Sequence, residues 1–348
     1  MRETTVAASI AIDMAVQLEQ LGFPREDVCR RARIDVALLA RPHDRIPGSA
    51  AHRLWQVAEQ LTGDSLLGLH MAEHYRTGAI SILGYVFLNC STVGEALERL
   101  ARFGALLNDG LRVRIDREGG QVVVRLEATE GTDNFLLTGG RHVFETMAAG
   151  IVQTMRRMCA GTFIPAAVWF RHHAAGDVAE YHRIFGMPVR FGMPEHRLAF
   201  RAGDLSAPIP TADAMMLTLF EGHAIGRLRE LEALRGVSQR VLALVSARLT
   251  GAVPSLPSLA RELAMSGRHL QRALKDEGTT YQELLDTARR ERAMLQLARP
   301  GATAAEVALL LGYSEAGAFT RAFKRWTGTT PGAYAAQNEP GGSAGESS

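Results

Sequence analysis

The chain has 348 residues, of which 47% are hydrophobic and 22% are charged, and its formal net charge is +2. At roughly 100–200 residues per domain, this length predicts two domains, each with enough apolar residues for a core. The three cysteines lie far apart and form no CxxC pair, which argues against a disulfide framework or a zinc site and favours a reducing cytoplasm. No stretch approaches about 18 apolar residues, so we expect no membrane contact.

The first two hundred residues mix helical and strand patterns. Alternating residues flank Gly119-Gly120 and predict a hairpin. Serine and threonine at Ser49 and Thr92 are expected to cap helices. We predict helices over 5–21, 25–33, 49–62, 92–107, 133–159 and 177–185, and strands over 111–115, 122–126, 167–170 and 198–200. Residues 1–205 are therefore predicted to form an α+β domain.

The remaining residues read as helix. After a break at 206–212, residues 206–236 are predicted to hold a connector helix. Residues 237–336 show only helical patterns, and the final stretch, 337–348, is low in complexity and predicted to be disordered. Residues 236–336 carry 13 Arg and Lys against 8 Asp and Glu, whereas 1–235 carry 26 against 27. A basic module beside a neutral one suggests that one part meets an anionic polymer.

The all-α part contains an internal repeat. The aligned pairs are 259–266 with 307–314, 270–275 with 319–324, and 278–280 with 328–330. In each copy a first helix ends in a small residue, Ala264 or Gly312, which permits a sharp turn, and a serine two residues later is expected to cap the next helix. That second helix has about 11 residues, or roughly 16 Å, and fits the major groove of DNA.

The segment between the two copies predicts a long linker helix over 281–298 that carries Arg289, Arg290 and Arg292. At 1.5 Å per residue it would span about 27 Å. A spacer of this length would hold two recognition helices about one turn of DNA apart, roughly 34 Å. One chain could then read two successive major-groove segments.

The repeat region resembles the DNA-binding domain of AraC/XylS transcription regulators. Its most specific part is Ala-x-x-x-Gly-Tyr-Ser, then Phe-x-Arg-x-Phe-Lys, then Gly-x-x-Pro-x-x-Tyr, between Ala308 and Tyr334. The resemblance implies base contacts from Arg268, Gln271, Arg272, Ala316, Gly317, Ala318, Thr320 and Arg321. Residues 316–318 lack hydrogen-bonding side chains. We therefore expect the second helix-turn-helix to position the protein on DNA more than it specifies sequence, although a small patch can meet a thymine methyl. Phosphate or solvent contacts are expected for Lys275, Lys324 and Arg325.

The N-terminal part resembles, over roughly residues 10–215, the effector domain of the ornithine-utilisation regulator subgroup. Arg45-Ile46-Pro47, Leu83-Gly84-Tyr85 and the stretch 185–189 are among the elements that carry the resemblance. It implies effector sensing without naming the effector. The helix-first order argues against the β-barrel sugar-binding domain of the arabinose regulator.

Other kinds of site have weaker support. His70 and His74 have a spacing that can bind zinc, but no HExxH glutamate accompanies them, so we favour a solvated or capping role and expect no metal or cofactor. No Ser/His/Asp order, Walker loop or GxGxxG after a strand is present, so we expect no catalytic residues. Candidates for an effector pocket are Phe87, Cys90, Phe103, Phe144, Met147 and Trp169, with Arg102 or Arg141 for an anionic effector. The six candidates other than the arginines are more commonly core residues, and the two arginines could equally lie on the surface. The effector site stays unknown.

The leading interpretation is a cytoplasmic transcription regulator that binds double-stranded DNA, a small-molecule effector and RNA polymerase, with a homodimer as one candidate assembly. The sequence leaves both an activator and a repressor open. Two alternatives remain open. One is an enzyme-like N-terminal domain fused to a DNA-binding module, which a turnover assay would reveal. The other is an architectural protein without an effector, which ligand-dependent thermal stabilisation would exclude.

Overall fold

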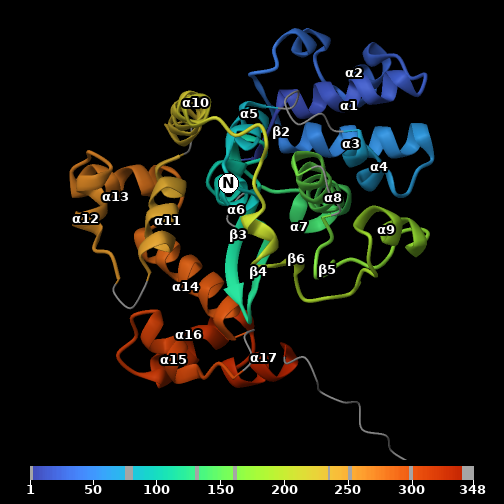
Figure 1. The fold of residues 1–348 in the computed structure, drawn as a ribbon. Helices are drawn as coiled ribbons and strands as arrows, with labels where there is room; N and C mark the ends of the chain where they lie inside the picture. The colour runs from blue at the N-terminus through green and yellow to red at the C-terminus, as the bar shows by residue number, and fades with distance from the viewer. Residues whose placement is uncertain are drawn as a thin grey trace, which may run out of the picture. The chain divides into compact units, whose positions relative to one another are not determined.

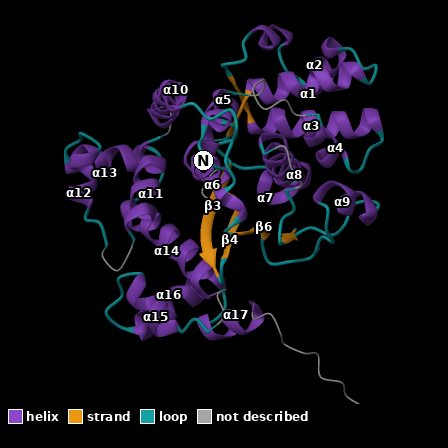
Figure 2. Cartoon of the chain, in the orientation of Figure 1, coloured by secondary structure: helices purple, strands orange, loops and turns teal. Residues whose placement is uncertain are grey.

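The structure is a computed structural model that describes residues 3–74, 81–129, 133–159, 163–233, 236–249, 253–297 and 301–338. The chain divides into two compact units, Met1–Leu231 and Glu232–Ser348, whose elements are labelled in Figure 1 and coloured by type in Figure 2. Within the described ranges, no helix has both the length and the apolar character needed to cross a membrane. The tail predicted to be disordered falls largely on 339–348, outside the described residues.

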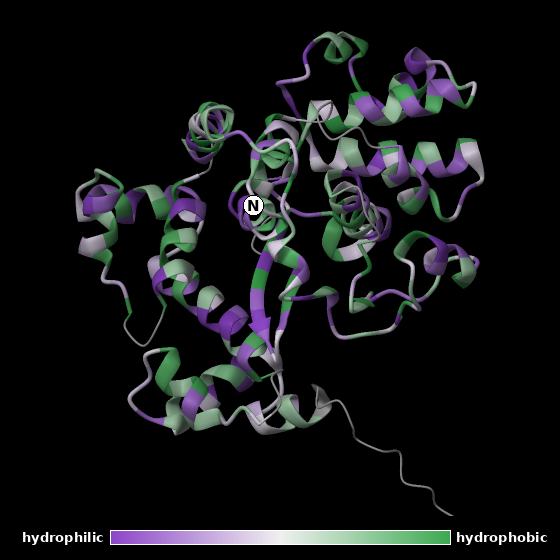
Figure 3. Cartoon of the chain, viewed as in Figure 1, coloured by the Kyte–Doolittle hydropathy of each residue, from purple (hydrophilic) through white to green (hydrophobic). Residues whose placement is uncertain are grey.

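The first unit is α+β, as predicted. Its helices are α1 (Ala8–Gln20), α2 (Arg25–Ala32), α3 (Gly48–Thr62), α4 (Leu67–Glu73), α5 (Ile82–Asn89), α6 (Val93–Phe103), α7 (Leu136–Gly139), α8 (Arg141–Met158), α9 (Val178–Phe185) and α10 (Ala214–Ala233), with short 3-10 turns η1 (Val36–Ala40), η2 (Gly104–Leu106) and η3 (Asp204–Ser206). Its strands are β1 (Thr5–Ala7), β2 (Arg45–Pro47), β3 (Leu111–Glu118), β4 (Gln121–Ala128), β5 (Ala167–Trp169) and β6 (His196–Arg201). Figure 3 shows hydrophobic and hydrophilic residues alternating around many of the helices, as amphipathic helices on a core require.

A four-stranded antiparallel sheet in the order β3-β4-β6-β5 organises the first unit. The predicted hairpin is confirmed, and Gly119 and Gly120 both have positive φ, 52° and 80°, as the tightest hairpin turns require. One face of the sheet is apolar and packs in the same core as α6 and α8. On the other face, the Arg125 guanidinium contacts Asp116, Glu118 and Glu195, so charges there are paired within the unit.

Two local predictions in the first unit are wrong. Residues 5–7 form β1 rather than the first turn of a helix, because they pair with β2 and the Thr5 N–H donates to Asp109 at 2.6 Å, a partner 104 residues away. Ser49 does not cap α3, which already begins at Gly48. Thr92 does cap α6, since its hydroxyl accepts a hydrogen bond from the Glu95 N–H at 3.2 Å.

The helix expected to connect the domains, α10, packs as part of the first unit. Its residues Leu217, Ala224 and Leu231 are buried in one hydrophobic cluster with residues of α5 and α6. Arg99 and Arg102 of α6 also contact Glu221 of α10, at 3.2 and 2.7 Å. The first unit therefore extends to Leu231 rather than ending at residue 205, because this helix has its own apolar face to bury.

The second unit is entirely helical in its described residues. It consists of α11 (Val237–Arg248), α12 (Leu256–Glu262), α13 (Gly267–Asp276), α14 (Tyr281–Leu297), α15 (Ala304–Leu310), α16 (Ala316–Thr327) and α17 (Pro331–Asn338). One hydrophobic core contains residues from both halves of the repeat, among them Leu270 of α13 and Phe319 of α16. The long helix α14 contacts α11, α15, α16 and α17, so it links the two halves.

Candidate nucleic-acid interface

The first helix-turn-helix consists of α12 and α13. Between them Ala264 has a φ of 55°, and the Met265 N–H donates to the Ala260 carbonyl at 2.8 Å, which closes α12 with a tight reversal. Ser266 caps α13, since its hydroxyl accepts from the His269 N–H at 3.2 Å. The predicted turn and cap are both confirmed for the first helix-turn-helix.

The second helix-turn-helix, α15 and α16, repeats the turn but not the cap. Gly312 has a φ of 74°, and the Tyr313 N–H donates to the Ala308 carbonyl at 3.0 Å. These contacts match those around Ala264. The prediction that Ser314 caps α16 is wrong, because the helix starts one residue later and Glu315, at the capping position, makes no side-chain cap.

The outer face of α13 carries four of the predicted DNA-contacting residues, Arg268, Gln271, Arg272 and Lys275. Their spacing of three, four and seven residues places them on one side of a helix. All four are exposed, and within the described part of the chain none of their side chains forms a hydrogen bond or ion pair. On the opposite side, Leu270 and Leu274 are fully buried. The helix thus presents a cationic and amide-bearing face while its apolar face is fixed in the core.

The outer face of α16 is less polar. Ala316, Gly317, Arg321 and Lys324 are exposed and Ala318 is half-buried, whereas Phe319, Ala322 and Phe323 are buried. The half-buried Thr320 donates its hydroxyl proton to the Ala316 carbonyl at 2.9 Å, so the hydroxyl oxygen can only accept from a ligand. Arg325 is placed differently from the other predicted residues, because its guanidinium donates to Asp286 of α14 at 2.9 Å.

The linker helix α14 is held firmly against the second helix-turn-helix. It has 17 residues, which correspond to about 25 Å at 1.5 Å per residue. Its Arg289 donates from Nε to the Leu311 carbonyl at 3.1 Å and stacks on the Tyr313 ring, 4.3 Å from the centroid. This arginine therefore supports the turn between α15 and α16.

The effector-pocket candidates in the first unit separate into two groups. Phe87 and Met147 line a cavity. The others do not line it: Cys90, Phe103 and Phe144 are buried in the core, and Trp169 lies under the Arg197 guanidinium. Arg102 pairs with Glu221, and Arg141 pairs with Glu59 and Glu145. Sequence patterns missed most of the cavity wall, because cavity-lining and core residues have the same apolar periodicity.

The two histidines considered as zinc ligands have other surroundings. His70 contacts Asp64 at 2.5 Å and Glu180 at 3.1 Å. Burial alone would lower the pKa of His70, but these two carboxylates raise it. His74 is the residue at the end of α4. Among the described residues, no cluster of three or more His, Cys, Asp or Glu could hold a metal ion.

Comparisons with known proteins agree with this architecture. A profile described as "Arabinose-binding domain of AraC transcription regulator, N-term" matches residues 22–209, and a helix-turn-helix domain profile matches 259–337. The chain belongs to the AraC family of transcription regulators. Members of this family combine an N-terminal ligand-binding domain with a C-terminal helix-turn-helix DNA-binding domain, and the two units of this AraC-family regulator correspond to them.

Curated relatives extend over most of this AraC-family chain. It is 30% identical to the ornithine utilization regulator of Pseudomonas aeruginosa, over 90% of this chain and 91% of that protein. It is 31% identical to the transcriptional regulator VirS of Mycobacterium tuberculosis, over 77% and 78% of the two chains. Among solved structures, the transcriptional regulator CdpR from Pseudomonas aeruginosa matches 89% of this chain and 96% of that one, at 25% identity and a TM-score of 0.42.

Proposed function

We propose that this AraC-family regulator reads its DNA site mainly through α13. In this proposal Arg268, Gln271 and Arg272 face base edges in the major groove, and Lys275 contacts phosphate. Arginine pairs with guanine and glutamine with adenine through two hydrogen bonds each, worth about 1–3 kcal/mol of discrimination. The observation that carries the proposal is the exposed face of α13, whose four polar side chains have no partner within the described residues.

We assign α16 a positioning role in the neighbouring stretch of groove. Its exposed Arg321 and Lys324 suit the DNA backbone or a base edge, while the first turn offers only small apolar side chains and the Thr320 oxygen. The rigid support of α14, through Arg289 and the shared core, favours presentation of both helices to one duplex. Arg325 is the least suited of the predicted residues, because Asp286 already neutralises it.

Binding to a duplex selected from random sequences by the full-length chain tests this assignment. Arg268→Ala should weaken binding by about 1–3 kcal/mol and relax the preference at one base pair. Lys275→Ala should weaken binding to all duplexes alike, and it should lower the salt dependence of binding by about one counterion. Arg325→Ala removes the same charge as Arg268→Ala and should change base preference little, so it is the matched control.

An Arg268→Ala chain with unchanged affinity and base preference would contradict the base-contact role of α13. Loss of binding with a broadened unfolding transition would indicate a folding defect instead. Measuring the unfolding of the second unit in parallel separates the two cases. If Arg325→Ala relaxes base preference as strongly as Arg268→Ala, both helices read bases, and the proposal that α13 is the main reader is wrong.

We further propose that the chain is a cytoplasmic, non-enzymatic activator that contacts RNA polymerase and can form a homodimer. Its named relatives are transcription regulators, and its three cysteines are free, two of them buried. A reporter gene behind the selected duplex measures activation, and sedimentation with and without that duplex measures assembly. Repression of the reporter, or a monomer under all conditions, would contradict the corresponding part of the proposal.

A further inference from the structure

We propose that the first unit binds an uncharged, largely apolar small molecule in a cavity between α1, α3, α5, α6 and α8. This inference rests on the proposed function in one respect, since it names the chemical class of the effector to which the regulator responds. The cavity has a volume of about 150 Å³. Cavities of this size lined by aliphatic and aromatic residues accept a single aromatic ring or a small hydrocarbon.

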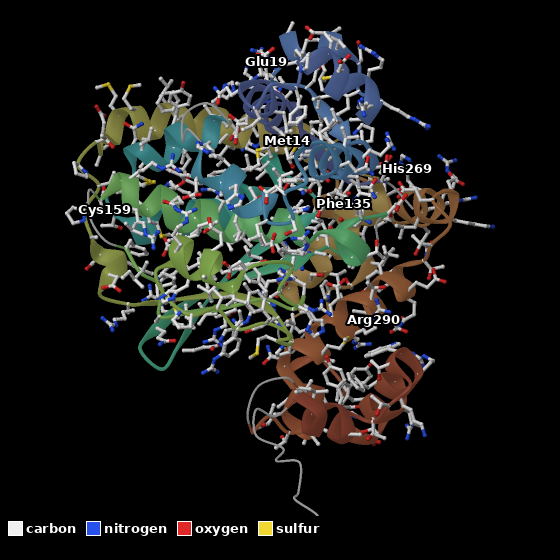
Figure 4. All side chains as sticks on the ribbon, turned by 90° about the vertical axis from the view of Figure 1, so that its right-hand side faces the viewer. Met14, Glu19, Phe135, Cys159, His269 and Arg290 are labelled. Atoms are coloured by element: carbon white, nitrogen blue, oxygen red, sulfur yellow. The ribbon has the colours of Figure 1, made fainter. Side chains whose placement is uncertain are left out.

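Side chains from several separate segments form the wall of the cavity. Met14 of α1 and Phe135, at the start of α7, both line it and are labelled in Figure 4. Other prominent wall residues are Trp55, Phe87, Leu97, Met147 and Met155. Methionine side chains are flexible and polarisable, so they adapt to the shape of an apolar guest. The wall therefore suits an apolar ligand whose shape it can follow.

The polar inventory of the wall is small. No described lining residue is charged, and the polar lining residues are Ser81, Asn108, Thr146 and Thr154. The Ser81 hydroxyl accepts from the Leu83 N–H at 3.0 Å, and Thr146 donates to the Gly68 carbonyl at 2.7 Å.

Two of these polar residues, Asn108 and Thr154, have a side-chain group without a hydrogen-bond partner among the described residues. The Asn108 side-chain oxygen accepts from the Gly110 N–H at 2.9 Å, but its Nδ2 makes no hydrogen bond among the described residues. The Thr154 hydroxyl makes none there either. The Ser81 hydroxyl can also still donate and the Thr146 oxygen can still accept. A bound molecule would thus meet mainly apolar walls and a few uncharged groups able to hydrogen-bond it.

This inventory disfavours an amino acid or a sugar as occupant. A zwitterion such as ornithine carries ammonium and carboxylate groups, whose burial is costly without charged partners. The nearby candidates for such partners, Arg102 and Arg141, are paired with Glu221 and with Glu59 and Glu145. A sugar needs hydrogen-bonding partners around its whole ring, and most of the wall is apolar. An uncharged molecule with one carbonyl or hydroxyl group meets neither difficulty.

The position of the cavity gives an occupant influence over the whole unit. Three hydrophobic clusters contribute to its wall: Leu54 belongs to the cluster around α1 to α3, Leu97 to the one under the sheet, and Leu83 to the one that includes α10. Protein interiors are otherwise close-packed, so this space leaves wall atoms without dispersion contacts. An apolar guest restores those contacts to all three clusters at once. It therefore favours the conformation in which they are assembled.

Toluene, an uncharged molecule with a single aromatic ring, is the probe that tests the site in the full-length chain. We expect saturable binding in titration calorimetry and a higher melting temperature of the first unit, because a ligand that binds only the folded state stabilises it. Ornithine and arabinose, at the same concentrations, should neither displace the probe nor raise the melting temperature.

Two substitutions on α6 provide a matched pair. Ala96 lines the cavity, and Ala96→Leu should fill it and weaken probe binding at least tenfold while unfolding stays cooperative. Ala101 lies on the same helix outside the lining, and Ala101→Leu should bind the probe as the wild type does. If Ala96→Leu fails to fold, Met147→Lys replaces it, because Met147 is a half-buried wall residue and a charge there should also weaken binding at least tenfold.

Probe binding that survives both Ala96→Leu and Met147→Lys would overturn the inference, and so would stabilisation by ornithine that Ala96→Leu abolishes. Binding to the selected duplex is measured on the same samples. A chain that binds the duplex but not the probe refutes the apolar site alone. A chain that binds the probe but shows no preference for any duplex refutes the proposed function and leaves the cavity assignment standing.

Discussion

The guanidinium of Arg289, on the linker helix, lies 4.3 Å from the centroid of the Tyr313 ring, directly after the turn of the second helix-turn-helix. The same arginine donates to the Leu311 carbonyl at 3.1 Å. Both contacts join α14 to the segment that positions α16. An arginine that sequence alone would assign to the solvated or DNA-facing surface is thus part of the scaffold that aims a recognition helix.

Arg289→Ala should lower the unfolding free energy of the second unit by about 1–3 kcal/mol, since it removes a cation–π contact and leaves the Leu311 carbonyl without its partner. Tyr313→Phe keeps the ring and should cost much less than Tyr313→Leu. The Arg289→Ala and Tyr313→Leu effects should be non-additive in urea unfolding, as expected for residues in contact. Unchanged stability, together with a smaller salt dependence of DNA binding, would instead place Arg289 on a phosphate.

Exchanging the small residue in each of the two turns should change the stability of the second unit in opposite directions. Ala264 has a φ of 55° and Gly312 a φ of 74°. A left-handed conformation costs a residue with a Cβ roughly 1–2 kcal/mol, whereas glycine loses about 0.5–1 kcal/mol more entropy on folding. Ala264→Gly should therefore stabilise the second unit by about 0.5–1 kcal/mol, and Gly312→Ala should destabilise it. Urea unfolding of both variants checks the signs, and destabilisation by Ala264→Gly would show that the turn needs the alanine methyl.

Under α16, thymine methyl groups should contribute more than hydrogen bonds do. Ala316 and Gly317 are exposed at the start of that helix and have only hydrogen or a methyl group to offer. Deoxyuridine in place of thymidine deletes one methyl, and at a contacted position it should cost about 0.8 kcal/mol. Fluorescence anisotropy with singly substituted duplexes measures the effect. No loss at any thymine in the segment assigned to α16 would mean that this helix contacts backbone alone.

The duplicated helix-turn-helix could be predicted from sequence because its signals are local. Buried Leu270 and Phe319 recur in the same frame as the turn residues Ala264 and Gly312, and the fold repeats that frame. The outward placement of Arg268 follows from the same periodicity. The cap at Ser266 was likewise local, whereas Ser314 failed as a cap because α16 starts one residue later.

Features that depend on distant partners could not be predicted. Strand β1 exists because of β2 and Asp109, and Arg325 turns to Asp286, 39 residues away. The cavity is the clearest case, since Phe87 and Phe103 have the same apolar character but only Phe87 lines the space. Whether an apolar side chain faces a neighbour or a void is decided by the packing of whole helices, which no local pattern encodes.

His196 gives the first unit a predictable dependence on pH. It is buried, and its ring stacks on Phe144 with a centroid distance of 3.8 Å. Burial, followed by the nearby charges of His172 and Arg171, lowers the pKa of His196 to about 3. Its pKa in the unfolded chain is about 6.5. Between these two values the unfolded state binds a proton that the folded state does not.

The unfolding free energy of the first unit should therefore be fully retained above about pH 6.5 and decline as the pH falls toward 3, by roughly 1.4 kcal/mol per unit. At pH 5 the loss due to His196 should reach about 2 kcal/mol. His196→Phe preserves an aromatic ring beside Phe144 but cannot titrate, so its unfolding free energy should depend less on pH over this range. His172→Gln is the control, because burial also lowers the pKa of His172. That variant isolates the contribution of His172 to the pH dependence of the unfolding free energy. Urea unfolding between pH 5 and 7.5 gives the slopes. A His196→Phe slope equal to that of the wild type would mean that this ring binds its proton as readily in the folded unit as in the unfolded chain.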